Sequence, residues 1–253
     1  MKGSSLIISF SSIKGGVSKT SSCVNLAYAL SAFRPTKKVL VVDLDPQAAA
    51  THHLSSKFDN LFPNTLYHFI DGKCDIEDAT YQYNKKFDLI PCSSELRKLS
   101  LSKFEKGLKK VISLLEEEYD FVFFDLAPSM YETSTIPLVF SDYVIVPVNC
   151  PQGLSLLGVE AQAEIIVEIC ETKNKNLDVL GILPSFIDRT KMSKDVLSYL
   201  KDFYKDDLFS GIRKYTAISQ ASSLGKTIFE HQEDCKGADD FKKFAKEFLK
   251  RVS

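Results

Sequence analysis

The sequence predicts an α/β fold in which helices cover both faces of a doubly wound, mostly parallel sheet. Short apolar runs, many of them β-branched or aromatic, alternate along the 253 residues with longer segments of helical periodicity. Several of these runs are apolar at nearly every position, which is typical of strands buried on both faces of a parallel sheet. Because strands and helices alternate, the sheet is expected to be doubly wound.

The same patterns place the individual elements. The strands are expected at residues 6–10, 39–43, 87–91, 121–125, 143–148 and 179–186. The helices are expected near residues 20–33, 104–118, 155–170 and 193–204. No repeat, low-complexity tract or linker rich in Pro, Gly and Ser divides the chain, so residues 1–253 are expected to form a single domain. Residues 51–86 are the least regular part and are expected to cap the ligand side of the sheet.

Composition excludes several classes of protein. Lys and Arg number 32 against 33 Asp and Glu, which argues against nucleic-acid binding through bulk positive charge but leaves a local basic patch open. No run approaches the roughly 18 apolar residues of a membrane span, and the first apolar stretch is too short for a secretory signal. The six cysteines are scattered without a C-x-x-C pair, which favours buried thiols in a cytoplasmic protein over disulfides or a metal site.

Ligands of such sheets bind at the carboxyl ends of the strands, and the first of these positions carries a glycine-containing loop. Residues 11–21, SSIKGGVSKTS, lie between the first strand and the first helix. Small residues let consecutive N–H groups turn inward around phosphate oxygens, and the helix N-terminus adds donors and a positive dipole end. This predicts a phosphate-binding loop in which Lys19 reaches the β/γ-phosphates and the Thr20 hydroxyl ligates Mg²⁺.

The loop departs from the strict pattern G-x-x-x-x-G-K-[ST]. Ile13 and Ser18 occupy the two glycine positions. A Cβ at Ser18 has a cost if the backbone there requires a positive φ. Taken alone, the segment could be a strand-to-helix turn that contains a lysine, so the residues at the other strand ends have to decide.

Carboxylates follow two further strands. Asp43 ends the second strand and Asp45 comes two positions later, so both point to the same side of an extended chain. Such a pair can cap a turn, but beside a triphosphate one carboxylate can serve the hydrated Mg²⁺ while the other orients the attacking water. Asp125 ends the apolar strand 121–125 and can hold the metal. The loop and the three aspartates together predict a site that binds and hydrolyses a nucleoside triphosphate.

Residues 14–20, KGGVSKT, resemble the deviant Walker A motif KGGxGK[ST] of the ParA/MinD family of P-loop ATPases. The resemblance implies a P-loop NTPase fold with ATP and Mg²⁺ as cofactors. It also implies a homodimer in which Lys14 crosses the interface to the partner's nucleotide. A second cation there can neutralise charge on the transferred phosphoryl group, as an arginine finger does. The departure is Ser18, where most members have glycine, and it is expected to slow turnover or weaken binding.

Two further segments carry the resemblance. The string D-x-D-P-Q at 43–47 resembles switch I of ParA proteins, in which the second aspartate, here Asp45, acts in hydrolysis; its Pro-Gln pair favours ParA over MinD. Residues 125–129 are similar to the D-x-P-P-S switch II, with Ala127 in place of one proline. The roles implied are catalysis for Lys14, Lys19 and Asp45, and metal binding for Thr20, Asp43 and Asp125. The nucleotide contacts implied are Lys14, Gly15, Gly16, Val17, Ser18, Lys19, Thr20 and Ser21, with Tyr215 as a candidate beside the adenine.

The second half of the chain carries the candidate DNA contacts. Arg189 lies in a segment similar to the family's D-x-R-T, whose arginine contributes to non-specific DNA binding. It could instead pair with Asp188. The position of a second DNA-contacting arginine holds Ala217, and Arg213 and Lys214 are the residues that could compensate.

The last helix is amphipathic. Its apolar positions include Phe241, Phe244 and Phe248, and its opposite face carries Lys242, Lys243, Lys246, Lys250 and Arg251. A basic amphipathic helix can bind a membrane surface, as the MinD tail does. The favoured interpretation is that this helix packs on the sheet with a solvated basic face.

The expected function is that of a ParA-like partition ATPase of the Soj type, without an N-terminal helix-turn-helix domain. The resemblance implies an ATP-sandwich homodimer on non-specific nucleoid DNA, released when a ParB-like activator stimulates slow hydrolysis. The protein is expected to be cytoplasmic and nucleoid-associated, without membrane binding. The alternatives are a MinD-like membrane-bound positioning ATPase, a metabolic synthetase on the same scaffold, and a nucleotide-binding module in which Ser18 prevents turnover.

Overall fold

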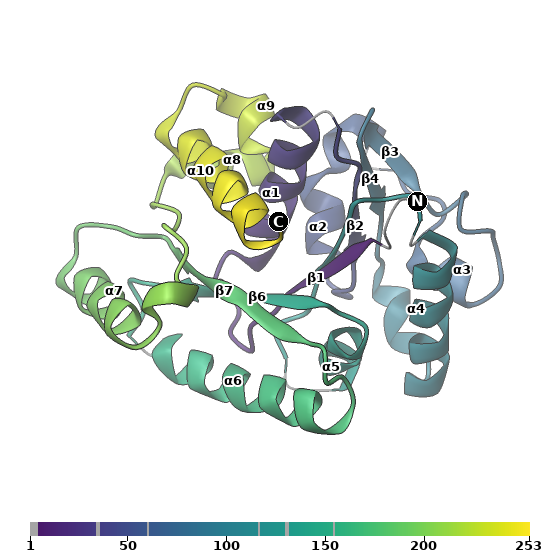
Figure 1. Cartoon of the computed structure of the whole chain (residues 1–253). Coiled ribbons are helices and arrows are strands. Elements are labelled where there is room, and N and C mark those ends of the chain that lie inside the picture. The colour runs from purple at the N-terminus through teal and green to yellow at the C-terminus, as the bar shows by residue number, and fades with distance from the viewer. Residues whose placement is uncertain (1–4, 34–35, 60, 116, 130–131, 154) are drawn as a thin grey trace.

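A computed structural model describes residues 5–33, 36–59, 61–115, 117–129, 132–153 and 155–253 (Figure 1). In this part of the chain the sheet has seven strands in the order β3-β4-β2-β5-β1-β6-β7. Neighbouring strands are parallel except for the edge strand β3, which is antiparallel to β4. The predicted fold class, a mostly parallel sheet with helices on both faces, is confirmed.

The elements of the described residues follow the predicted alternation. The strands are β1 Leu6–Phe10, β2 Val39–Asp43, β3 Tyr81–Asn84, β4 Phe87–Ile90, β5 Phe121–Asp125, β6 Tyr143–Asn149 and β7 Asp178–Ser185. The helices are α1 Lys19–Phe33, α2 Ala49–His53, α3 Leu66–Ile70, α4 Leu101–Leu115, α5 Glu132–Val139, α6 Ser155–Thr172, α7 Lys191–Phe203, α8 Thr216–Ser223, α9 Ile228–Gln232 and α10 Lys236–Arg251. Each expected strand agrees with the structure to within one residue, and each expected helix to within three. Glu116, inside the expected helix 104–118, lies outside the described residues.

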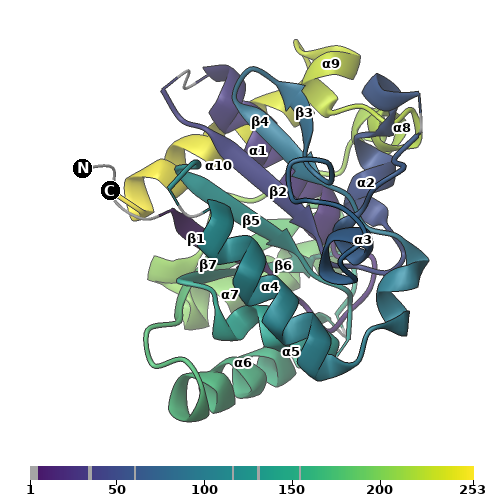
Figure 2. The ribbon, with the colours of Figure 1, turned by 90° about the vertical axis from the view of Figure 1, so that its right-hand side faces the viewer.

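Alternate strand residues enter two separate cores, because successive side chains of a strand point to opposite faces. In β2, Val39 and Val41 join the core beneath α1 and α10, whereas Leu40 and Val42 join the core beneath α4 and α6. The helices α1, α2, α8, α9 and α10 cover the first face, and α3 to α7 cover the other (Figure 1, Figure 2). Burial on both faces explains why the strands are apolar at nearly every position.

The segment 51–86 contains elements that the sequence did not predict. The strand β3 forms the antiparallel edge of the sheet, so the expectation that the whole segment caps the ligand side is wrong for this part. Its sequence, YQYN, is short and alternates in polarity, and only Tyr83 is fully buried. An edge strand needs little apolar sequence, because only part of it packs on the core.

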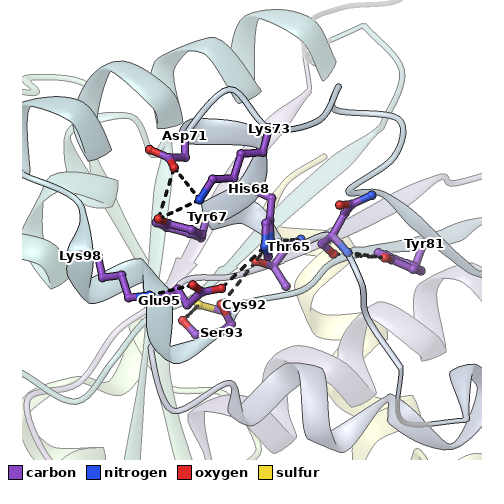
Figure 3. Close-up of polar contacts among 11 residues, drawn as sticks. Thr65, Tyr67, His68, Asp71, Lys73, Tyr81, Cys92, Ser93, Glu95 and Lys98 are labelled. Carbon is purple, nitrogen blue, oxygen red and sulfur yellow. Dashed lines mark hydrogen bonds and ion pairs between the residues drawn. The ribbon is translucent and has the colours of Figure 1, made fainter.

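Helix α3, in contrast, does lie over the ligand side. The Leu66 N–H donates to the Pro91 carbonyl, directly after β4, at 2.9 Å. Figure 3 shows the polar contacts that hold the start of this helix. The Thr65 N–H donates to His68 Nδ1 at 3.2 Å, and the Thr65 hydroxyl lies 3.4 Å from that of Ser93. This part of the segment therefore caps the carboxyl end of β4, as expected.

Helix α10 packs on the sheet, which confirms the favoured interpretation of its amphipathic pattern. Phe241, Phe244 and Phe248 are at most 1% exposed, and the Phe248 ring lies 5.2 Å from that of Phe121. Arg251 is not part of an open basic face. Its guanidinium donates to four backbone carbonyls, those of Leu180, Asp206, Asp207 and Leu208.

Long apolar helices are absent from the part of the chain that the structure describes. None of the helices in these residues has both the length and the apolar character needed to cross a bilayer.

His53 at the end of α2 is a buried titratable group. Its side chain is 1% exposed, and burial lowers its pKa to about 4 from an ordinary value of 6.5. The carbonyl of Lys226 and the charge of Glu230 favour the protonated ring, but burial outweighs both. The folded chain therefore binds this proton less readily than the unfolded chain does.

We expect this histidine to make the fold acid-sensitive. As the pH falls from about 6.5 towards 4, the unfolded state takes up a proton that the folded state refuses, so the free energy of unfolding falls by up to about 3 kcal/mol. Urea unfolding at a series of pH values should show this loss in the wild type and a flatter profile in His53→Leu. His52→Leu, a change at the exposed neighbour, is the control. Equal pH slopes for wild type and His53→Leu would contradict the assignment.

Candidate nucleotide site

The loop between β1 and α1 turns through two left-handed residues. Gly16 has a φ of 69° and Ser18 has a φ of 70°. From the sequence, a Cβ at Ser18 was expected to destabilise the loop only if the backbone there has a positive φ. The φ is positive, so this destabilisation applies. A residue with a Cβ is disfavoured there by roughly 1–2 kcal/mol. Val17, between the two, is buried.

Lys19 lies across the loop. Its Nζ donates to the Lys14 carbonyl at 3.2 Å, and the residue is 7% exposed. Burial lowers the pKa of this ammonium, while the charges of Asp125 and Asp45 act in the opposite direction. The ammonium is thus held by the loop's own carbonyl and lies within electrostatic range of two carboxylates, where a phosphate would meet it.

Lys14 is exposed and lies against its own chain. A Cβ placed on Gly158 of α6 would come within 2.7 Å of Lys14 Cγ. The stem of the lysine therefore runs over α6 at a residue that has no side chain. An exposed ammonium on a flexible stem can turn towards a second molecule.

Thr20 and Asp125 meet at the ends of α1 and β5. The Thr20 hydroxyl donates to Asp125 Oδ2 at 2.7 Å. Oδ1 of Asp125 is buried and has no hydrogen-bond partner among the described residues. Burial and the nearby charge of Asp43 raise the pKa of Asp125 to about 8. A buried oxygen without a donor, beside a hydroxyl, suits a hard divalent cation such as Mg²⁺, which takes oxygen ligands.

Asp43 faces Asp125 from the adjacent strand, since the two are paired in the register of β2 and β5. Its Oδ1 accepts from the Asp45 N–H at 3.0 Å, and its Oδ2 accepts from the N–H and hydroxyl of Thr51 at 2.8 and 2.7 Å. Burial raises the pKa of Asp43 to about 6, although these hydrogen bonds favour the charged carboxylate and act to lower it. Both oxygens are engaged by the chain's own donors. The metal role predicted for Asp43 therefore has less support than that of Asp125, and a positioning role has more.

Asp45 begins the tight turn that follows β2. Its Oδ1 accepts from the Gln47 N–H at 2.8 Å, and its carbonyl accepts from the Ala48 N–H at 2.7 Å. Ala48 takes a left-handed φ of 56°. Asp45 is 7% exposed and close enough to Lys19 to influence its charge. The turn thus fixes this carboxylate within electrostatic range of Lys19.

A cavity of about 290 Å³ opens beside the loop. Ser18 and Ser21 form its loop side, and Phe186, Arg213 and Tyr215 line the wall. Its volume and partly aromatic wall suit a nucleobase, so the predicted position of Tyr215 beside a base agrees with the geometry.

The three predicted DNA contacts lie on adjacent segments. The Lys214 N–H donates to the Ile187 carbonyl at 2.9 Å, so the segment that carries Arg213 and Lys214 lies beside the segment that leads to Arg189. Arg189 and Lys214 are exposed. The Arg213 guanidinium is bound to Asp240 at 2.5 Å. Arg213 is therefore a weaker candidate for a phosphate contact than the other two.

Arg189 makes no ion pair with Asp188 in the described part of the chain. The Asp188 carboxylate instead accepts from the N–H and hydroxyl of Thr190. The alternative of a surface pair between the two neighbours is thus wrong.

Three residues that support the site were not predicted from the sequence. Asn149 and Ser185 end β6 and β7 and contact Gly16 and Ser18. A polar residue that closes an apolar strand was the available signal for both. Thr51, the partner of Asp43, lies in the irregular segment, where no pattern marks it.

Comparison with known proteins agrees with this geometry. A family model described as an AAA domain matches residues 5–179. The chromosome-partitioning ATPase Soj of Thermus thermophilus is 31% identical over 249 residues, which cover 97% of this chain and 96% of that protein. The chain belongs to the ParA/MinD family of P-loop ATPases. Another member of the family, the sporulation initiation inhibitor protein Soj of Bacillus subtilis, is 29% identical, with 95% of this chain and 97% of that protein covered.

Solved structures show the same architecture. Cobyrinic acid a,c-diamide synthase from Mycobacterium smegmatis, with a bound ATP analog and magnesium, has a TM-score of 0.80 and 26% identity over 98% of this chain and 96% of that one. MinD from Pyrococcus horikoshii, complexed with Mg-ADP, has a TM-score of 0.82 and 23% identity, with 98% of each chain covered. The second likeness supports the ParA/MinD fold alone.

We expect Asp125→Asn to separate stability from metal binding. The change removes a buried carboxyl group that must either stay charged or take up a proton on folding. The melting temperature without ligand should therefore rise by at least about 2 °C, which corresponds to roughly 1 kcal/mol in a domain of this size. In titrations of ADP with and without Mg²⁺, the variant should lose most of the gain in affinity that Mg²⁺ gives the wild type. Asp178→Asn, at an exposed strand end, is the control. A variant that keeps the full Mg²⁺ effect would exclude Asp125 as the metal-binding carboxylate.

Proposed function

We propose that this protein is a ParA-like partition ATPase that binds ATP with Mg²⁺ and hydrolyses it. The observation that carries the proposal is the meeting of Lys19, Thr20, Asp125 and Asp45 at one edge of the sheet. The similarity to the partition ATPase Soj, which extends over nearly the whole chain, supports the biological role.

The phosphates would lie in the loop between β1 and α1. Backbone N–H groups and the N-terminus of α1 would hold the phosphate oxygens, and Lys19 would neutralise the β- and γ-phosphates. Bound Mg²⁺ would stabilise the negative charge of the phosphates. Thr20 and Asp125 would hold it, with Asp43 keeping the following turn in place through Thr51.

Asp45 is the residue proposed to orient the attacking water. Its carboxylate lies at the mouth of the loop, and its turn is fixed by the Gln47 N–H. Correct placement of water and phosphate supplies most of the catalysis in this class of reaction.

Lys14 is proposed to act across a dimer. Its exposure supports this role, because an ammonium on the surface can reach the nucleotide of a second subunit. In the proposed cycle the ATP-bound dimer binds nucleoid DNA in the cytoplasm, and a ParB-like activator stimulates hydrolysis and release. Arg189 and Lys214 would contact DNA phosphates.

A metabolic synthetase is the second candidate function. A cavity of about 490 Å³ adjoins Asp45 and Gln47 and is also lined by Leu96, Arg97 and Phe104. The likeness to cobyrinic acid a,c-diamide synthase, at 26% identity, favours this candidate. Product analysis separates the two, since a synthetase makes a product besides ADP and phosphate. The MinD-like alternative loses support, because the apolar face of α10 is buried on the sheet.

Asp45→Asn should uncouple binding from hydrolysis. Loss of a water-orienting carboxylate should lower ATP turnover on the order of a hundredfold, whereas ADP affinity should change little because the loop is intact. The measurement is phosphate release with DNA and a candidate ParB-like partner present. Turnover at the wild-type rate in this variant would refute the catalytic role of Asp45.

DNA retention should require ATP and depend on exposed cations. Arg189→Ala and Lys214→Ala should each weaken binding and lower the slope of log affinity against log salt by about 0.9 for each DNA phosphate that is no longer neutralised. Arg213→Ala should have a smaller effect on the slope, because Asp240 neutralises its guanidinium. The measurement is fluorescence anisotropy of labelled duplex DNA with saturating ATP.

Lys201→Ala is the matched control, because it removes one exposed positive charge near the far end of α7. Retention without ATP, or a salt slope unchanged in Arg189→Ala, would count against the DNA clamp.

A further inference from the structure

The two left-handed residues of the loop are both held by side chains from neighbouring strand ends. Asn149 Nδ2 donates to the Gly16 carbonyl at 3.0 Å, and the Ser18 hydroxyl donates to that of Ser185 at 2.7 Å. Asn149 and Ser185 are direct register partners on the parallel strands β6 and β7. Side chains at the ends of two adjacent strands (Figure 1) thus hydrogen-bond to the loop at its two residues with a left-handed backbone.

The hydrogen bond to Ser185 matters most at Ser18, because Ser18 is a non-glycine residue in a left-handed conformation. Its φ of 70° suits glycine, and the Cβ of serine makes this conformation harder to keep. The serine hydroxyl makes a hydrogen bond that glycine could not make, and it also lies 3.2 Å from the Ser22 hydroxyl. The bond to Ser185 can therefore offset part of the cost of the Cβ.

The Ser185 hydroxyl has a hydrogen-bond partner other than Ser18. Its side chain is fully buried, and its hydroxyl already donates to the Leu183 carbonyl at 3.3 Å. Ser18 uses only the remaining acceptor capacity of Ser185. The contact therefore serves the loop more than it serves the strand.

The Ser18–Ser185 hydrogen bond also connects the two sides of the predicted nucleotide cavity. Ser18 lies on the loop side of the cavity, and Phe186, the residue after Ser185, lines its wall. Phe186 has a left-handed φ of 56°, so its position depends on a backbone that the surroundings must hold. The Ser18–Ser185 bond fixes the phosphate loop and this wall relative to each other.

We propose that Ser185, acting through Ser18, is a positioning residue for the nucleotide: the two hydroxyls hold the loop in its phosphate-binding conformation in a chain that lacks the glycine of the Walker motif. The proposal depends on nucleotide binding at this loop and not on the role in partition.

The test is a double-mutant cycle on the full chain, with Mg-ADP affinity measured by calorimetry. Ser185→Ala and Ser18→Ala should each weaken Mg-ADP binding about five- to tenfold, as expected for the loss of one buried hydrogen bond. In a Ser18→Gly background, which has neither the Cβ nor the hydroxyl, Ser185→Ala should have no further effect. If Ser185 acted only through the packing of β7, Ser185→Ala would weaken Mg-ADP binding equally in the wild-type and Ser18→Gly backgrounds.

Ser9→Ala is the matched control, because it breaks a second buried serine pair, with Ser141 at 2.7 Å, that lies in β1 and not in the loop itself. Its Mg-ADP affinity should equal that of the wild type. Equal effects of Ser185→Ala in the wild-type and Ser18→Gly backgrounds would overturn the proposal, as would Ser18→Ala with wild-type affinity. Ser18 is only partly buried, whereas Ser185 is fully buried, so Ser18→Ala gives a result even if Ser185→Ala fails to fold. A wild type that binds no Mg-ADP would refute nucleotide binding itself, which is a different outcome from Ser18 and Ser185 variants that bind Mg-ADP as tightly as the wild type.

Discussion

Two buried carboxylates on adjacent strands are the constraint around which the site is arranged. Asp43 and Asp125 are paired in register, and neither is accessible to solvent. Like charges in a buried environment destabilise each other unless hydrogen bonds or cations compensate them. Thr51 and the Asp45 N–H compensate the first, and Thr20 together with Lys19 compensates part of the second. The unpartnered oxygen of Asp125 leaves a ligand position that a cation can occupy.

This constraint links the loop, the turn after β2 and the strand β5 into one unit. Thr51 ties α2 to Asp43, so the turn that carries Asp45 follows the position of β2. The same strand edge continues at β6 and β7, where Asn149 and Ser185 hold the loop from the other side. A change at the phosphate loop can therefore reach both the hydrolytic turn and the wall of the base cavity through short hydrogen-bonded paths.

Most of the fold could be predicted because burial on both faces makes a strand easy to recognise. β2 and β5 are apolar up to their terminal aspartates, and their ends coincide with the expected ones. The edge strand β3 was missed because its partly exposed YQYN has no such signature. The short helices α2, α3, α5, α8 and α9 were missed because helices of five to eight residues have too few positions to show a clear period.

The sequence by itself determined the fold class, the family, and the residues of the loop and the carboxylates, because each follows from local order along the chain. Only the tertiary structure decided how these residues divide the work. It showed that Asp43 is engaged by Thr51, that Arg213 is bound to Asp240, and that Ser18 is held by Ser185. The residues of each pair are between 8 and 167 positions apart. Hydrogen bonds over such separations depend on how strands and helices pack, which no local pattern records.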